Sequence, residues 1–415
     1  MTRRFTATGH LIDSGIMTKI FNLIISEEAD YQVVSFDIGK MNNEYSAMEL
    51  DLICSTDEQL EILTQKLIQV GCYEKSATKA VLKPCPKDGC VPDDFYSTTN
   101  HRTEVFAGDR WIEVRGQRMD AVIVVNGEDA RCVKVRDVRK GELAVCNPEA
   151  VRVFPPFRDR QGDLFGFMTN EVSSERSVDV IVERVAHELR EHRKQGKKVV
   201  VVAGPVVVHT GGSSALCTLI REGYVQGLLS GNALAVHDIE SVLFGTSLGV
   251  AVTTGRPTHE GHRNHMCAIN RVRYYGSMKA AVDAGALTRG IMYEIISNQV
   301  PYCLAGSIRD DGPLPETVND MIEAQRQYAT IVENASMVIM LSSMLHSIGT
   351  GNMLPSWVKT VCVDINPAVV TKLADRGSSQ AVGVVSDVGL FLRALAGRLT
   401  STPSDVQTGA EHHER

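Results

Sequence analysis

The first ninety residues alternate between strand-like and helix-like patterns of hydrophobic positions. Residues 3–12 alternate apolar and polar side chains, and residues 14–26 place their apolar side chains on one helical face. Two more alternating runs follow, then an amphipathic helix over 57–70 and a returning strand over 77–83. The order βαββαβ predicts a ferredoxin-like domain over residues 1–92.

Short apolar runs separated by glycine turns predict a small β domain over residues 93–160. Asn126-Gly127 lies between two such runs and is typical of a hairpin. Pro155-Pro156 and the polar residues after them interrupt the pattern, which predicts a domain boundary at 160.

Uninterrupted apolar runs characterise the third region, which we assign to residues 161–399. Val199–Val202 are four consecutive valines and suit a strand covered on both faces. Further strands are expected over the ranges 300–305, 337–341, 358–363 and 381–385, most of them followed by a helix. Repeated strand-to-helix units predict an α/β fold, a doubly wound, Rossmann-like parallel sheet. The polar tail, 400–415, is expected to be disordered.

The composition narrows the range of partners. The 415 residues are 43% hydrophobic and carry a formal net charge of -7, with no basic stripe, which disfavours nucleic acid. No apolar run is long enough to cross a bilayer and the first residues do not resemble a signal peptide, so no membrane partner and a cytoplasmic location are expected. Cys85 and Cys90 form the one close cysteine pair and lack partners for a zinc site, so no metal is expected.

Small or hydrogen-bonding residues follow each predicted strand of the third region. Ligands of an open parallel sheet bind beyond the carboxyl ends of its strands. We therefore expect one ligand site there. The segments concerned are 209–212, 231–233, 306–312, His346 with 350–352, 364–366 and 386–388.

Asp364 follows a strand, so its carboxylate could accept both hydroxyls of an adenine ribose, or it could cap the next helix. Asp387 allows the same two interpretations. Asn232 and Asn352 offer uncharged donors and acceptors.

Arg309, Asp310 and Asp311 could hold the carboxylate and ammonium groups of an amino acid. The alternative is an exposed turn, because Arg-Asp-Asp-Gly-Pro is ordinary loop composition.

A helix starting near Ala233 would place His237 and Glu240 on one face with Asp238 beside them, and any of the three could act as a general base. A carboxylate near a helix start can equally be a partner of the helix dipole alone. The polar cluster 260–265 could close over a ligand or could be a solvated loop.

Long segments of the chain resemble the archaeal-type, NAD-dependent ornithine cyclodeaminase family and the carboxy-terminal part of cyanobacterial bifunctional arginine dihydrolase/ornithine cyclodeaminases. The segments include DDFYSTTN, LLSGNALAVHDIE, LAGSIRDDGPLP, SMLHSIGTGNMLPS and VCVDINPAVVTKLADRG. The resemblance implies a nucleotide-binding domain related to that of deoxyhypusine synthase, bound NAD, and a homotetramer or homodimer. It implies no arginine dihydrolase activity, because the guanidine-modifying domain is absent. The implied cofactor contacts are Asn232, Ala233, Asp310, Thr350, Gly351, Asn352, Met353, Leu354, Asp364, Asp387 and Val388.

The implied reaction converts L-ornithine to L-proline and ammonia. Hydride removal from Cα gives an imine, the δ-amine attacks it, ammonia leaves, and the cyclic imine takes the hydride back. Within this scheme we predict Arg309 as the carboxylate anchor and Asp311, Asp238 or His237 as the base. The alternatives are a saccharopine-type or opine-type dehydrogenase, a deoxyhypusine-synthase-like transferase, and a non-catalytic sensor that binds NAD and an amino acid.

Overall fold

A computed structural model of the chain describes residues 1–9, 11–12, 15–39, 44–74, 78–154, 174–252, 254, 256, 258, 261–310, 312–376 and 381–400. Contacts divide the chain into two units. Unit 1 comprises Met1–Thr169, Asn352–Trp357 and Gly377–Gln380, and unit 2 comprises Asn170–Gly351, Val358–Arg376 and Ala381–Arg415. The predicted boundary at 160 and the tail after Thr400 lie outside the described residues.

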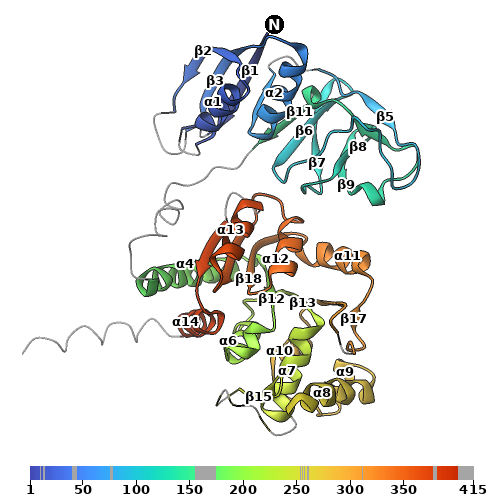
Figure 1. Ribbon diagram of the computed structural model, residues 1–415, viewed down its shortest axis with the longest axis vertical. Helices are drawn as coiled ribbons and strands as arrows, with labels where there is room; N and C mark the ends of the chain where they lie inside the picture. The colour runs from blue at the N-terminus through green and yellow to red at the C-terminus, as the bar shows by residue number, and fades with distance from the viewer. Residues whose placement is uncertain are drawn as a thin grey trace, which may run out of the picture. The chain divides into compact units, whose positions relative to one another are not determined.

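Unit 1 begins with a four-stranded antiparallel sheet in the order β2-β3-β1-β4, which confirms the ferredoxin-like topology (Figure 1). Alternation places Phe5 and Leu50 on the inner face of the sheet, where both are fully buried together with Leu63 of the second helix. The elements are β1 (Thr2–Gly9), α1 (Ile16–Ser26), β2 (Asp30–Asp37), β3 (Ser46–Ile53), α2 (Asp57–Gln69) and β4 (Cys72–Glu74).

The predicted position of the fourth strand was wrong. The sequence pattern placed it over 77–83, whereas the sheet is completed by Cys72–Glu74, which pairs with β1. Gly71 has a φ of 84°, so the chain turns back directly after α2, and Cys72 is fully buried. Leu82–Pro84 forms β5, which belongs to the second sheet.

The second sheet of unit 1 has seven strands in the order β11-β6-β7-β9-β8-β10-β5. The expected glycine turns are present, with positive φ at Gly108, Gly116, Gly127 and Gly141. The elements are β5, β6 (Arg102–Ala107), β7 (Arg110–Arg115), β8 (Val122–Asn126), β9 (Asp129–Val133), η1 (Val135–Asp137), β10 (Leu143–Val145), η2 (Pro148–Ala150) and β11 (Val151–Phe154).

Unit 2 is built on a seven-stranded parallel sheet in the order β17-β16-β13-β12-β18-β19-β20, which confirms the doubly wound, Rossmann-like prediction. Its strands are β12 (Lys198–Ala203), β13 (Gly227–Gly231), β16 (Tyr302–Ala305), β17 (Thr317–Val318), β18 (Ala335–Leu341), β19 (Lys359–Asp364) and β20 (Ala381–Val385). A small hairpin, β14 (Thr246–Ser247) with β15 (Val250–Ala251), lies apart from the sheet.

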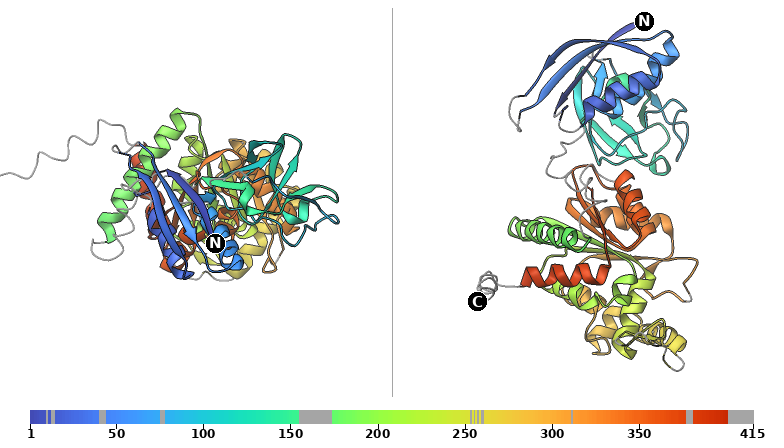
Figure 2. Two further views of the ribbon diagram at one scale, coloured as in Figure 1. Left: turned by 90° about the horizontal axis from the view of Figure 1, so that it is seen from above. Right: turned by 60° about the vertical axis from the view of Figure 1, so that its left-hand side comes forward.

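Helices connect these strands on two sides of the sheet. In one group α4 and α14 lie side by side, as both figures show, and α14 also contacts α6 (Figures 1 and 2). In the other, α12 contacts α11 and α13. The helices are α4 (Ser174–Lys194), α5 (Val206–His209), α6 (Ser213–Arg221), α7 (Asn232–Phe244), α8 (Gly261–Tyr275), α9 (Met278–Asp283), α10 (Ile291–Ser297), α11 (Met321–Val332), α12 (Met344–Gly351), α13 (Pro367–Arg376) and α14 (Val388–Thr400).

The strand order reverses between β12 and β18. From β12 the next strands along the chain, β13 and β16, are added on one side of the sheet. The later strands β18, β19 and β20 are added on the other side. The ends of β12 and β18 approach closely, since a Cβ on Gly204 would lie 2.3 Å from the carbonyl oxygen of Ser342. Such a reversal is where open α/β sheets place their ligands.

The segment between β12 and α6 contains a short helix that the sequence analysis did not predict. Val206–His209 forms the short helix α5, so His209 lies one helical turn beyond the strand end. The start of α14 packs onto the following turn: a Cβ on Gly389 would lie 2.2 Å from the carbonyl oxygen of Thr210. Arg393 of α14 donates to the carbonyls of Thr210 and Gly211. Among the described helices, none is long and apolar enough to cross a membrane.

Candidate functional site

The carboxyl ends of the unit 2 strands meet at one edge of the sheet. The parallel register pairs Ala203 with Ser230 and with Leu341, and it pairs Asp364 with Val385. Gly231 pairs with Ala305 in the same way. The residues that follow these strands therefore converge, as the sequence predicted.

Asn232, the first residue of α7, ties this edge to the loop after β16. Its side-chain oxygen accepts the N–H of Leu314 at 3.0 Å and the hydroxyl of Thr317 at 2.9 Å. These bonds occupy the carbonyl end of the buried Asn232 amide. Ala233 follows and is partly exposed.

Two buried hydroxyls on α12 have no hydrogen-bond partner in the described part of the chain. They are Ser347 Oγ and Thr350 Oγ1, one helical turn apart. Thr350 is fully buried, and Gly351 ends the helix. Asn352, Met353 and Leu354 continue the chain and are assigned by their contacts to unit 1, where Met353 and Leu354 are buried.

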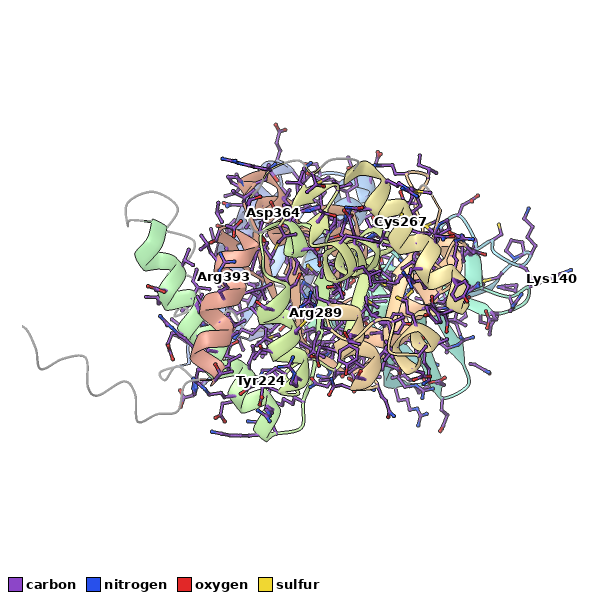
Figure 3. All side chains as sticks on the ribbon, turned by 90° about the horizontal axis from the view of Figure 1, so that it is seen from below. Lys140, Tyr224, Cys267, Arg289, Asp364 and Arg393 are labelled. Carbon is purple, nitrogen blue, oxygen red and sulfur yellow. The ribbon has the colours of Figure 1, made fainter. Side chains whose placement is uncertain are left out.

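Asp364 and Asp387, each predicted as a cofactor contact or a helix cap, differ in the hydrogen bonds that they accept. Asn366 caps α13 through the N–H of Ala368, while Asp364 accepts only the N–H of Asn366 through Oδ1. The second oxygen of Asp364 has no partner among the described residues. Asp387 accepts the N–H of Leu390 and so caps α14, while Val388 is buried. Figure 3 labels Asp364, at the end of β19, and Arg393, on α14.

Arg309 lies on an exposed turn, which was the alternative interpretation of this segment. Asp310 closes the turn by accepting the N–H of Ser307 at 2.8 Å, and Ile308 is fully exposed. Arg309 has no side-chain ion pair or hydrogen bond among the described residues. Asp311 lies outside the described residues.

Asp238 binds the start of another helix. Its two carboxylate oxygens accept the N–H groups of Ile291 and Met292, each at 2.9 Å, and the side chain is fully buried. Burial raises the pKa of Asp238 to about 6, against the effect of these two bonds. The arrangement favours a capping role for Asp238 over the predicted role of base.

His237 and Glu240 join a cluster that the sequence did not reveal. The cluster, termed the histidine cluster below, consists of His209, His237, Glu240, Ser247 and His265. It draws on α5, α7, β14 and α8. His265 lies in the polar segment 260–265, which continues into helix α8 from Gly261.

Contacts within the histidine cluster are direct. Ser247 Oγ lies 2.8 Å from His209 Nδ1 and 3.4 Å from His237 Nδ1. Glu240 Oε2 lies 3.5 Å from His237 Nδ1 and 3.4 Å from His265 Nδ1. The three rings also contact one another, with centroids 4.8 Å apart in the pairs His209–His237 and His237–His265.

Glu240 is held as a buried carboxylate. Burial opposes its ionisation, but hydrogen bonds from His237, His265, the N–H of Gly249 and the hydroxyl of Thr246 hold its pKa well below the usual range. Leu248 donates a further N–H. Burial, followed by the proximity of His237, lowers the pKa of His209, which keeps this imidazole neutral near pH 7.

The ligand atoms of His237, Glu240 and His265 lie within 4.8 Å of one another, a spacing that a metal ion could bridge. The sequence predicted no metal site. Glu240 already accepts two main-chain N–H groups and one hydroxyl, which leaves little lone-pair capacity for a cation. The histidine cluster is therefore a set of titratable side chains in direct contact, an arrangement that can hold and move protons.

Comparison with known proteins identifies the family. Residues 183–395 match the model of the ArgZ-like arginine dihydrolase C-terminal Rossmann fold, 102–182 match the first region of the same C-terminal part, and 2–101 match a conserved region of the LOR/SDH bifunctional enzyme. The ornithine cyclodeaminase of Methanococcus maripaludis is 48% identical over 95% of this chain and 97% of its own.

Two solved structures of bifunctional cyanobacterial proteins are similar over most of this chain. Apo ArgZ, an arginine dihydrolase, has a TM-score of 0.84 and 44% identity over 96% of this chain and 58% of its own. AgrE in ternary complex with ornithine and NAD+ has a TM-score of 0.54 and 47% identity over 98% of this chain and 58% of its own. The chain belongs to the family formed by the archaeal ornithine cyclodeaminases and the C-terminal regions of ArgZ-like proteins.

Proposed function

We propose that this chain binds NAD and converts L-ornithine to L-proline and ammonia. The observation that carries the proposal is the 48% identity, over nearly the full length of both chains, to a protein named ornithine cyclodeaminase. AgrE, a further relative, was solved with ornithine and NAD+.

The edge of the unit 2 sheet has the groups that NAD would need. The second oxygen of Asp364 is available for ribose hydroxyls, and the unpartnered hydroxyl of Thr350 lies in the helix after β18. Gly231 allows His346 to approach the end of β13 closely, since a Cβ there would lie 2.7 Å from Nε2 of His346. The residues that would hold NAD remain those expected from the sequence: Asn232, Ala233, Asp310, Thr350, Gly351, Asn352, Met353, Leu354, Asp364, Asp387 and Val388.

Bound NAD would supply a reversible two-electron acceptor, which makes the overall conversion redox neutral. The chain's own residues would have to move protons, because the two amino groups of ornithine are cationic at neutral pH and one of them must become a nucleophile. Neutral His209 would accept a proton, and Ser247 would hold its ring through the contact at Nδ1. Glu240 would stabilise the imidazolium that forms.

The other predicted catalytic residues have less support. Asp238 is engaged by α10 on both of its oxygens. Arg309 is exposed, so its role as carboxylate anchor stays a prediction, as does the role of Asp311.

Ornithine deuterated at Cα tests the proposal. Incubation with the protein and NAD should give proline that retains the deuterium at Cα, together with one equivalent of ammonia and no net reduction of NAD. Ornithine consumption without proline would contradict the proposal.

A dehydrogenase of the saccharopine type is the second candidate, favoured by the match of residues 2–101 to the LOR/SDH region. That activity would transfer the deuterium to NAD in proportion to substrate consumed. A sensor would bind NAD and an amino acid without forming either product.

A further inference from the structure

Unit 1 contains buried polar atoms that have no hydrogen-bond partner in the described part of the chain. Buried polar atoms normally have partners, so such a group indicates a site completed by a polar ligand or by water. Five such atoms lie on residues assigned to unit 1. The atoms are Tyr96 Oη, His101 Nδ1, Gln117 Oε1, Arg118 Nε and Ser356 Oγ.

The residues that carry these atoms lie on three short segments that are hydrogen-bonded to one another. Residues 96–101 run beside residues 117–121, and the segment 352–357 lies against the first of them. The bonds that hold them are Thr98 Oγ1 to the carbonyl of Arg118 at 2.6 Å, Gln117 Nε2 to the carbonyl of Thr99, Thr98 N–H to the carbonyl of Ala121 at 2.9 Å, and Ser356 N–H to the carbonyl of Asn100 at 2.8 Å.

Arg118 is the charged member of the group. Its side chain is partly buried and has no ion pair or hydrogen bond among the described residues. Burial, and then the charge of Arg136, lowers its pKa, yet an arginine stays charged at any physiological pH. A partly buried guanidinium without a counter-charge is costly, which is typical of a position that binds an anion.

Neighbouring charges leave Arg118 unneutralised. Lys134 donates to the carbonyls of Met119 and Asp120, which fixes the segment that carries Arg118. Arg136 pairs with Asp137 at 3.6 Å. Asp137 favours the charged form of Arg118. This effect is smaller than the opposing effects of burial and of the charge of Arg136.

We propose that Arg118, Gln117, Tyr96, His101 and Ser356 form a binding site in unit 1 for the carboxylate of a free amino acid. A guanidinium binds a carboxylate through two parallel hydrogen bonds. The oxygen of Gln117 can accept from an ammonium group, and the hydroxyls of Tyr96 and Ser356 can donate or accept. The sequence analysis assigned no role to these residues.

His101 fits an uncharged role at this site. Burial, and then the charge of Lys19, lowers its pKa to about 4, so its imidazole is neutral at physiological pH. A neutral imidazole can form a hydrogen bond to a zwitterion without competing with Arg118 for the carboxylate.

Two sources of the amino acid share this chemistry: the substrate ornithine of the proposed function, or a separate effector. The site itself does not depend on the proposed function. Calorimetric titration of the NAD-loaded protein with L-ornithine, L-arginine and L-proline, combined with ornithine kinetics, distinguishes them.

Arg118→Gln should abolish or weaken by at least tenfold the binding of one of these amino acids. If the site holds substrate, the KM for ornithine should rise at least tenfold with a smaller change in kcat. If it holds an effector, ornithine kinetics should keep their wild-type values in the absence of that effector.

Arg136→Gln is the matched control, because it removes the same charge from an exposed neighbour, and it should bind like the wild type. Arg118→Lys keeps the positive charge but lacks the planar guanidinium, so it should also weaken binding. It serves as the test if Arg118→Gln does not fold. Arg118→Met should melt at or above the wild-type temperature without ligand, because it removes an unpaired charge.

Wild-type affinity in both Arg118→Gln and Arg118→Lys, or no saturable binding of any of the three amino acids, would overturn the proposal. Binding without proline formation would instead contradict the proposed function alone.

Discussion

Glu240 and His265 lie on different helices, yet Oε2 of Glu240 is 3.4 Å from Nδ1 of His265. The same oxygen is 3.5 Å from Nδ1 of His237. Glu240 also accepts hydrogen bonds from the Thr246 hydroxyl and from the N–H groups of Leu248 and Gly249, which follow α7. One buried carboxylate thus organises the histidine cluster and the loop that carries Ser247.

Glu240→Gln should lower kcat for ornithine by about 100-fold, a usual size for the loss of a general acid-base system. The loop N–H groups would also lose a charged acceptor, so stability should fall by about 1–3 kcal/mol. Steady-state kinetics over a range of pH and thermal melts measure the two effects. Glu222→Gln, at an exposed position, is the control. Unchanged kcat in a folded Glu240→Gln protein would remove the histidine cluster from the mechanism.

Asp238→Asn should affect stability more than catalysis. The amide oxygen can replace one acceptor of the α10 N–H groups but not both, so we expect a loss of about 1–2 kcal/mol. Turnover of ornithine should stay within about twofold of wild type, since neither oxygen is free to take a proton from substrate. Steady-state kinetics and chemical denaturation measure the two effects. Turnover reduced about 100-fold, with unchanged unfolding, would restore Asp238 as a candidate base.

Asp364→Ala should weaken NAD binding by roughly 10- to 100-fold, the effect of losing hydrogen bonds to a charged group. Titration calorimetry with NAD measures it. Asp320→Ala is the control, because Asp320 caps α11 through the N–H groups of Ile322 and Glu323 and should alter stability only. Wild-type NAD affinity in Asp364→Ala would leave this carboxylate with only its turn-forming role.

The stability of unit 1 should decrease as the pH falls from about 6.5 to about 4. The pKa of His101 is lowered from 6.5 to about 4 in the folded protein, so unfolding takes up a proton in this window, and the folded state loses up to about 3 kcal/mol before the effect levels off below pH 4. Both tryptophans, Trp111 and Trp357, belong to unit 1, so their fluorescence follows its unfolding. His101→Gln should flatten this pH dependence. If the stability of the His101→Gln variant depends on pH as steeply as that of the wild type, other groups cause the pH dependence.

Gly389→Ala should destabilise unit 2 by about 1–3 kcal/mol, because the new Cβ would lie 2.2 Å from the main-chain oxygen of Thr210. Gly397→Ala, in the same helix, has no atom within 4 Å of its Cβ and should stabilise by about 0.5–1 kcal/mol. Chemical denaturation should show a lower free energy of unfolding for Gly389→Ala and a higher one for Gly397→Ala than for the wild type. A stabilising Gly389→Ala would show that α14 can move away from the turn.

Several elements were predictable because consecutive residues alone show which positions are buried. Val199–Val202 identified a central parallel strand, and the polar residues after each strand identified the edge where Asn232 and Asp364 lie. Cys72–Glu74 escaped prediction because three residues are too few to establish an alternation. Helix α5 was not predicted because four residues are too few to establish a helical period, although Pro205 starts a helical turn there.

By itself the sequence determined the ferredoxin-like topology, the parallel sheet and the position of its polar edge, since each follows from local periodicity and from the rules that connect strands to helices. Only the tertiary structure decided which polar groups meet. His209, Ser247, Glu240 and His265 come from four separate elements, and Arg118 is distinguished from other arginines by burial without a partner. The physical reason is that proximity, desolvation and the satisfaction of hydrogen bonds arise from long-range packing, which no pattern of neighbouring residues records.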